Sequence, residues 1–184
     1  MSADNAAELG RRLRERDRSA APAVGSELDE LREEVARVSE ALGRTLKILV
    51  GKPGLDGHSN GAEQIAVRAR DAGMDVVYEG IRLTPAQIAR SAVDEGVHVI
   101  GLSILSGSHR ELVPDVVAAL REAGGADIPV VAGGIIPEAD ADALRETGVA
   151  AVFTPKDFEL TRILRAIVGI VAEQMKVPPT RSPA

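Results

Sequence analysis

From Leu46 onward, short runs of aliphatic residues alternate with longer stretches in which apolar positions recur every three or four residues. The short runs are typical of strands buried on both faces, and the longer stretches are typical of amphipathic helices. Strands are therefore predicted at 46–50, 74–78, 97–102, 128–132 and 149–153. Helices are predicted at about 59–72, 84–95, 109–123, 137–148 and 158–174.

This alternation predicts one α/β domain over 46–174, in which helices cover both faces of a parallel sheet. Five strands and five helices favour a flavodoxin-like, doubly wound sheet with strand order 2-1-3-4-5. Two boundaries have local support, because Gly73 suits the residue after a helix and Thr84-Pro85 suits a helix start. A ligand is expected outside the carboxyl ends of the strands, at the switch between strands one and three.

Residues 1–45 are predicted to be a polar N-terminal extension with one amphipathic helix at about 26–42. Ser26 suits the N-cap, and the apolar positions follow at alternating spacings of three and four. These positions are Leu28, Leu31, Val35, Val38 and Leu42. Such a stripe either forms an intersubunit contact, which would support a homo-oligomer, or packs on its own domain; we favour the partner-facing role.

The two ends of the chain are polar. Residues 11–18 read RRLRERDR, and we interpret this run as a solvated tail, with a docking arm for an acidic surface or a CoA phosphate as the alternative. The proline-containing stretch 175–184 has too few apolar residues to pack and is expected to be loose.

The composition disfavours several functions. Aromatic residues make up 2% of the chain and the formal net charge is −6, so nucleic-acid binding is disfavoured. The sequence has no cysteine, which removes thiolate metal sites and thiol nucleophiles and agrees with a cytoplasmic location. No run approaches the about 18 apolar residues of a membrane span, so a membrane partner is not indicated. Any chemistry must therefore use His, Asp, Lys or a bound cofactor.

The loop after the first strand carries the strongest candidate chemistry, because it combines glycines with Lys52, Asp56 and His58. The glycines allow a large flat ligand to approach the backbone closely. An imidazole is a good cobalt ligand, and the carboxylate of Asp56 can accept a hydrogen bond from the other ring nitrogen of His58. The spacing matches neither glycine fingerprint for phosphate binding, and a loop-stabilising role for His58 is the alternative.

Three motifs follow the ends of strands one, three and four in order. They are Asp-x-His-x-x-Gly (Asp56, His58 and Gly61), Ser-x-Leu (Ser103 and Leu105) and Gly-Gly (Gly133 and Gly134). With this set the chain resembles the cobalamin-binding domain of adenosylcobalamin-dependent acyl-CoA mutases, the methylmalonyl-CoA mutase family, over about 46–171. Three motifs at successive strand ends make the resemblance specific.

The resemblance implies that the cofactor's own benzimidazole leaves cobalt and inserts as a tail into a deep slot beside the sheet. His58 is then the axial ligand to cobalt. Asp56 is implied as the partner of its imidazole, with Lys52 near that carboxylate in a relay of charge that tunes the donor strength of the histidine.

The resemblance also implies a set of contacts with the cofactor. The residues assigned to them are Gly57, Gly61, Ser103, Leu105, Gly133, Gly134 and Thr154. Glycine leaves room for the tail at 61 and lets the backbone lie against the nucleotide at 133 and 134, while the Ser103 hydroxyl hydrogen-bonds the benzimidazole. The alternatives are a strand-end cap at Ser103 and a simple turn at the glycine pair.

The loop after strand five, residues 153–157, departs from the Gly-Pro-Gly-Thr-like stretch of this family. Lys156 and Asp157 stand where methylmalonyl-CoA mutases have Gly and Thr, whereas Thr154 remains assigned to the cofactor. Two segments of the sequence are most similar to ethylmalonyl-CoA mutases: Phe-Thr-Pro-Lys-Asp-Phe and Gly-Leu-Asp-Gly-His-Ser-Asn-Gly-Ala-Glu-Gln. The other two histidines are interpreted structurally, His98 as a packed strand residue and His109 as a helix cap, with contact to corrin amides as the alternative for His109.

The resemblance implies the cofactor-binding subunit of an acyl-CoA mutase, which has no catalytic residue beyond the tuning pair of Asp56 and Lys52. A substrate-binding (β/α)8 barrel needs about 250 residues, so it lies either on a separate large subunit or on another part of a longer enzyme of which this chain is a segment; we favour the separate subunit. The alternatives are a corrinoid carrier for methyl transfer and a cobalamin sensor or storage module. The carrier usually has a preceding four-helix module, for which residues 1–45 are too short, and no output domain of a sensor is visible.

Overall fold

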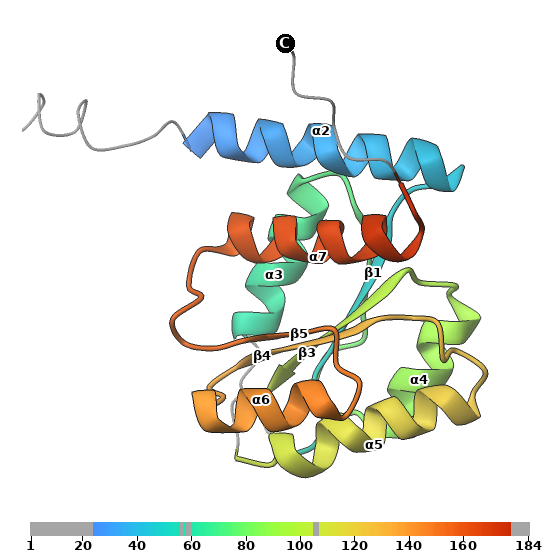
Figure 1. Ribbon diagram of the computed structural model, residues 1–184, viewed down its shortest axis with the longest axis vertical. Helices are drawn as coiled ribbons and strands as arrows, with labels where there is room; N and C mark the ends of the chain where they lie inside the picture. Colours follow the sequence, from blue (N-terminus) through green and yellow to red (C-terminus); the bar gives the residue numbers. More distant parts are fainter. Residues whose placement is uncertain (1–23, 56, 58–59, 105–106, 178–184) are drawn as a thin grey trace, which may run out of the picture.

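A five-stranded parallel sheet forms the centre of the molecule in the computed structural model, which describes residues 24–55, 57, 60–104 and 107–177. Its strands are β1 (Lys47–Gly51), β2 (Asp75–Tyr78), β3 (Val99–Ile104), β4 (Val130–Gly134) and β5 (Ala151–Phe153). They are arranged in the order β2-β1-β3-β4-β5, and every pairing is parallel (Figure 1). The flavodoxin-like order predicted from the sequence is confirmed.

Helices cover both faces of this sheet. They are α2 (Val24–Leu42), α3 (Asn60–Asp71), α4 (Pro85–Asp94), α5 (His109–Glu122), α6 (Glu138–Glu146) and α7 (Leu160–Gln174). Helices α4, α5 and α6 pack on one face, whereas α3 and α7 pack on the other, with α2 outside them (Figure 1). None of the helices in the described part of the chain is long and apolar enough to cross a membrane.

Local sequence signals account for the helix ends. The Thr84 hydroxyl accepts a hydrogen bond from the Gln87 backbone N–H, and the Gln87 side-chain oxygen accepts one from the Thr84 backbone N–H, so the predicted start of α4 is a complete capping box. Gly73 has a φ of +90°, which fits a residue that follows a helix. At α2 the prediction is wrong, because Ser26 lies inside a helix that begins at Val24.

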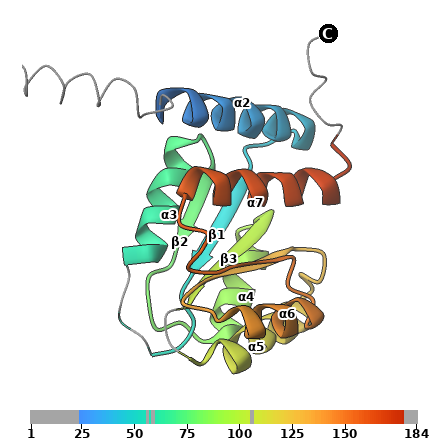
Figure 2. The same ribbon diagram turned by 60° about the vertical axis from the view of Figure 1, so that its left-hand side comes forward.

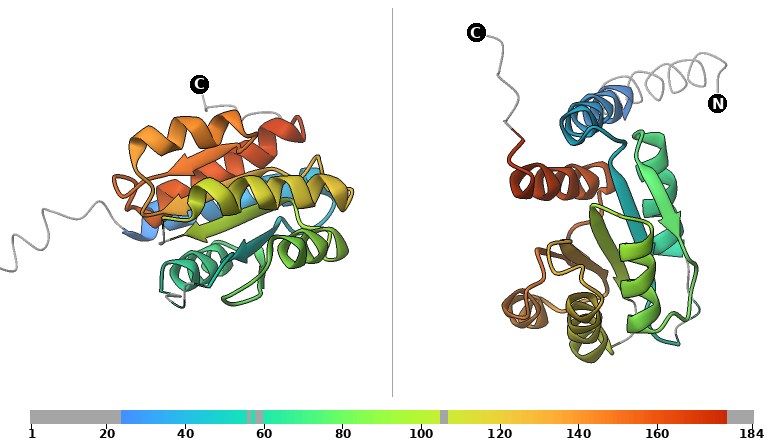
Figure 3. Two further views of the ribbon diagram at one scale, coloured as in Figure 1. Left: turned by 90° about the horizontal axis from the view of Figure 1, so that it is seen from below. Right: turned by 90° about the vertical axis from the view of Figure 1, so that its right-hand side faces the viewer.

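Helix α2 lies along α7 (Figures 2 and 3). Its apolar stripe is used within the chain, since Leu31, Val35 and Val38 are buried in the same cluster as the apolar face of α7. Ion pairs fix the contact, with Arg165 of α7 reaching Glu30 at 2.9 Å. The expectation that this stripe faces a partner is therefore corrected, because the stripe covers α7; a homo-oligomer through 26–42 stays a prediction.

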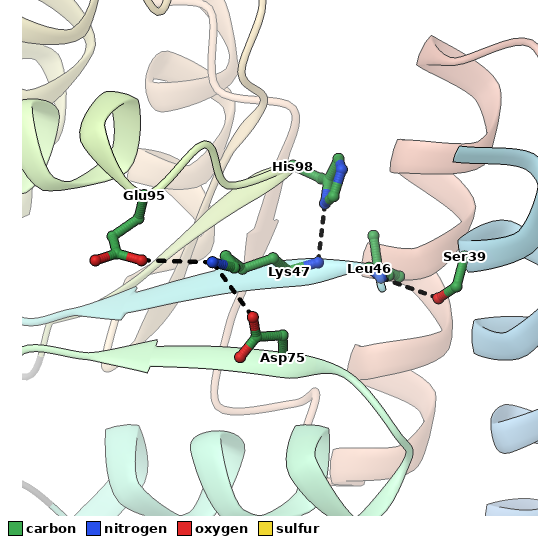
Figure 4. A network of polar contacts seen from close by, with 6 residues as sticks. All are labelled: Ser39, Leu46, Lys47, Asp75, Glu95 and His98. Carbon is green, nitrogen blue, oxygen red and sulfur yellow. Dashed lines mark hydrogen bonds and ion pairs between the residues drawn. The ribbon is translucent and has the colours of Figure 1, made fainter. Parts of the chain in front are cut away.

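A polar network closes the amino-terminal edge of the sheet (Figure 4). The backbone N–H of Lys47 donates to Nδ1 of His98 at 2.9 Å, and its ammonium pairs with Asp75 at 3.3 Å and Glu95 at 3.4 Å. Burial lowers the pKa of His98 below its ordinary value, which keeps the ring neutral and able to accept at Nδ1. His98 is thus a packed residue next to β3, as predicted.

Candidate functional site

A cleft opens on the face of the sheet that carries α3 and α7, above the carboxyl-terminal halves of β1, β3 and β4. Its volume is about 280 Å³. Gly101 and Ser103 of β3 and Gly133 of β4 lie along its floor. Ser103 pairs directly with Gly133, so the two motifs that follow strands three and four meet at one place. This is the sheet edge at which the fold predicts a ligand.

The cleft exists because side chains are small on one face of β3. Residues alternate between the faces of a strand, so Ile100 and Leu102 point into the core under α4 and α5 while Gly101 and Ser103 point to the cleft. A Cβ at Gly101 would meet only ordinary contacts, the nearest being Ile48 Cδ1 at 3.7 Å. A Cβ could therefore be accommodated at 101 in ordinary van der Waals contact, so packing does not require glycine there.

The walls of the cleft are apolar and come from two helices. They are Gly61, Ala62 and Ile65 of α3 and Leu160, Ile163 and Ile167 of α7. Gly61 stands in the first turn of α3, where an added Cβ would lie 3.7 Å from the Ser103 hydroxyl oxygen. Any larger residue at 61 would fill the space above that hydroxyl. The predicted residues Gly61, Ser103 and Gly133 are thus brought together by three different elements.

Gly134 differs from its neighbour Gly133. Its φ is +137°, and a Cβ there would lie 2.0 Å from the carbonyl oxygen of Ile104. The same carbonyl accepts a hydrogen bond from the Ile135 backbone N–H at 3.2 Å. Glycine at 134 is therefore required by a close backbone contact between β3 and β4, whereas at 133 the nearest neighbour of a Cβ would be Phe153 at 3.5 Å.

The loop after β5 forms the mouth of the cleft. Thr154 is buried there, and its backbone N–H donates to the Asp157 carboxylate at 2.8 Å while the Asp157 N–H donates back to its carbonyl at 2.8 Å. Lys156 pairs with Glu138 of α6 at 2.5 Å and is not among the residues that line the cleft. The two residues that depart from the family pattern therefore shape and tether this loop.

The loop after β1 is only partly described, because Asp56 and His58 lie outside the described residues. Leu105, which follows β3 in the sequence, also lies outside them. Lys52 has a side chain that is 0% exposed, and Gly57 is exposed. The start of this loop is joined to the loop after β2, since the Gly54 N–H donates to the Leu83 carbonyl at 3.0 Å. In the other direction, the Leu83 N–H donates a hydrogen bond to the Lys52 carbonyl at 3.3 Å.

His109 is not a helix cap, although it is the first residue of α5. Its ring is 3% exposed, and Nε2 lies 2.7 Å from the Asp140 carboxylate in the first turn of α6. Asp140 also accepts a hydrogen bond from Arg110. Arg110 and then His109 hold the pKa of the Asp140 carboxyl below its ordinary value. The prediction of capping is corrected: His109 joins α5 to α6 beneath the ligand edge.

Sequence reasoning missed Gly101 and Phe158 as cleft residues. Gly101 was concealed within the predicted strand 97–102, although a lone glycine in a strand is a signal of close approach by a ligand or another backbone. Phe158 was taken as the start of the last helix, but α7 begins at Leu160, and Phe158 is left in the loop at the cleft mouth.

A family model described as B12 binding domain matches residues 46–163. Ethylmalonyl-CoA mutase of Cereibacter sphaeroides is 67% identical over 144 residues, which are 78% of this chain and 22% of that protein. The 2-hydroxyisobutanoyl-CoA mutase small subunit of Aquincola tertiaricarbonis is 40% identical over 127 residues, which are 69% of this chain and 93% of that subunit.

The chain thus spans about a fifth of the ethylmalonyl-CoA mutase and nearly all of the small subunit. Among solved structures, a cobalamin-binding protein from Desulfitobacterium hafniense DCB-2 has a TM-score of 0.60 at 17% identity, covering 86% of this chain and 76% of that one. At this identity the likeness shows the fold.

Proposed function

The chain belongs to the B12-binding domain family, as the cobalamin-binding domain of acyl-CoA mutases, and on this premise we propose that it holds adenosylcobalamin with His58 as the axial cobalt ligand. In this proposal the nucleotide tail of the cofactor enters the cleft between α3 and α7, and the corrin ring lies over the carboxyl ends of the strands. The benzimidazole is then displaced from cobalt.

One observation carries the proposal: the cleft has a glycine floor, apolar walls and the Ser103 hydroxyl beside Gly61. A flat aromatic heterocycle fits such a space, because its faces need apolar surfaces and its ring nitrogen needs one hydrogen-bond partner. Side chains larger than glycine at 61, 101 or 133 would take up that space. The residues present therefore fit the tail of the cofactor.

The residues around His58 are assigned supporting roles. Lys52 is fully buried, and a buried ammonium requires an anionic or hydrogen-bonding neighbour. We assign Asp56 to accept a hydrogen bond from the imidazole N–H of His58, which fixes the ring's tautomer and orientation, and Lys52 to set the charge on that carboxylate. Removal of either would change how strongly His58 donates to the metal and leave the cleft itself intact.

Adenosylcobalamin, when bound, supplies the radical that starts a carbon-skeleton rearrangement. The residues of this chain bind and orient the cofactor, and the acyl-CoA site is proposed to lie in a (β/α)8 barrel on a separate large subunit. The small subunit of 2-hydroxyisobutanoyl-CoA mutase, of which the chain covers 93%, supports this division of labour. The ethylmalonyl-CoA mutase likeness, at 67% identity, supports an acyl-CoA as the substrate class.

Electron paramagnetic resonance of the Co(II) form tests the ligand assignment. The wild-type chain loaded with cobalamin and reduced should give cobalt lines split by one nitrogen, and the splitting should change from a triplet to a doublet when histidine carries ¹⁵N. His58→Ala should lose that coupling. His98→Gln is the matched control, because this imidazole lies at the opposite edge of the sheet, and it should keep the coupling. Histidine coupling that persists in His58→Ala would overturn the assignment.

The mutase role is tested by reconstitution. The loaded chain is mixed with candidate large subunits and acyl-CoA isomerisation is measured; we expect activity only when both proteins and the cofactor are present. Inactivity with every large subunit, together with methyl transfer from the loaded chain, would contradict the mutase role and favour a corrinoid carrier.

A further inference from the structure

Aromatic residues are scarce in this chain, yet its phenylalanines gather at one place. The sequence holds two Phe, one Tyr and no Trp. Both phenylalanines, Phe153 and Phe158, line the cleft between α3 and α7. The core clusters on the two faces of the sheet are otherwise built almost entirely from aliphatic side chains. The aromatic side chains are thus concentrated where a flat ligand is proposed to bind.

The two phenylalanines differ in how they are covered. Phe153 belongs to β5 and packs against the core cluster under α7. Phe158 is 84% exposed, although it lines the same cleft. Because Phe158 also lines the cleft, a ligand that covered its ring would gain the stabilisation that burial of apolar surface brings.

The backbone holds Phe158 at this mouth. The hydrogen bonds between Asp157 and Thr154 close the turn just before it, and α7 begins at Leu160 just after it. Phe158 therefore lies between two fixed points of the backbone, at a position that lines the cleft. Gly61 and Ile65 of α3 line the same cleft.

We propose that Phe158 closes over the cleft and stacks on the planar heteroaromatic base of the inserted nucleotide tail, which makes it a residue that selects corrinoids by their lower base. This inference rests on the proposed function, since it requires the tail to occupy the cleft. Rings pair most favourably in offset or edge-to-face arrangements, and the aliphatic wall of α3 can hold the far face of the base. The preference is then for a base with an aromatic face over a corrinoid without one.

Equilibrium dialysis with two corrinoids tests the proposal. Cobalamin carries the nucleotide tail, and cobinamide has the same corrin ring without it. Phe158→Ala should bind cobalamin about tenfold more weakly than wild type, as expected from loss of one stacking contact, and should bind cobinamide as wild type does. Phe158→Tyr should keep the wild-type affinity. Phe158→Leu, which is apolar without an aromatic face, should fall between Ala and Tyr.

Val67→Ala is the matched control, because Val67 is a large apolar residue that is 54% exposed on α3 and lies outside the cleft lining. It should leave both affinities unchanged. Circular dichroism establishes that each variant is folded. Unchanged cobalamin affinity in Phe158→Ala would overturn the stacking role, and so would equal weakening for both corrinoids. Failure of the wild-type chain to prefer cobalamin over cobinamide would instead contradict the proposed function, so the two failures are distinguishable.

Discussion

The two faces of the sheet are built from the same strands but differ in what lies on them. On β3, Ile100 and Leu102 face α4 and α5 and are buried in a continuous aliphatic core. Gly101 and Ser103, the residues between and beside them, face α3 and α7 and border the cleft. One strand therefore supplies the core with every second residue, while two of the residues between them border the proposed site.

The difference shows that the proposed site depends on small residues, which leave the cleft open, as much as on the side chains that line it. Cores pack at high density, so a row of small residues on one face of a sheet needs an occupant or leaves a void. The packed face has large residues throughout the length of β3, whereas the other face loses them only toward the carboxyl end, after Val99. That is also the end to which the fold directs ligands.

The largest effect should come from the packed face. Ile100 is 0% exposed, and Ile100→Ala should lower the free energy of unfolding by about 2–5 kcal/mol, because it leaves a cavity in the core. Urea denaturation measures this loss. The folded variant should still bind cobalamin with the wild-type dissociation constant. A large drop in affinity would contradict the independence of the two faces.

The next effect should come from the open face. Gly101→Val adds two methyl groups to a Cβ that itself would make only ordinary van der Waals contacts, the nearest at 3.7 Å. Cobalamin affinity should fall by about a hundredfold, as expected for about 2.7 kcal/mol of steric exclusion, while urea denaturation should show a loss of stability no larger than the about 1–3 kcal/mol of overpacking. Gly101→Ala should give a smaller loss. Wild-type affinity in the valine variant would show that the tail binds elsewhere.

A pH-dependent effect should follow from the contact between α5 and α6 on the packed face. Arg110 and His109 hold the pKa of Asp140 below its ordinary value of 3.8. A carboxyl whose pKa is lowered by folding stabilises the fold at pH above its unfolded pKa, and this contribution is lost as pH falls through the folded pKa. Asp140→Asn should therefore melt below wild type at neutral pH, and the gap should narrow below about pH 4. A gap that is constant across this range would contradict the ionic origin.

The smallest effect is expected at the cleft floor. Ser103→Ala should weaken cobalamin binding by about two- to tenfold, because one hydrogen bond to the tail is lost, and should not alter cobinamide binding. Dialysis with both corrinoids makes the comparison. Equal weakening for the two would place the hydroxyl at the corrin ring.

The fold could be predicted in detail because each strand is a short run of aliphatic residues, and each helix has apolar positions that recur every three or four residues. Gly73, which follows α3, and the capping box at Thr84 depend on neighbouring residues alone, so both helix boundaries could also be predicted. The meeting of Gly61, Ser103 and Gly133 in one cleft followed from the strand order.

Contacts between residues that are far apart in the sequence could not be predicted. The apolar stripe of α2 has the same pattern whether it covers α7 or a partner. Which of the two it packs against depends on the opposing surface. His109 meets Asp140 across 31 residues, so its position at a helix start misled the prediction. The exposure of Phe158 depends on where α7 begins, and helix boundaries are the least certain feature of a pattern.

The central claim is that the nucleotide tail occupies the cleft between α3 and α7, and the δ1-methyl signals of isoleucine test it most directly. Ile65 and Ile163 line this cleft, while Ile88 and Ile100 are buried on the opposite face. Methyl NMR spectra are recorded with saturating cobalamin and with saturating cobinamide. We expect Ile65 and Ile163 to shift with cobalamin and not with cobinamide, and Ile88 and Ile100 to keep their positions with both. Unshifted Ile65 and Ile163 in the cobalamin-bound chain would contradict the account.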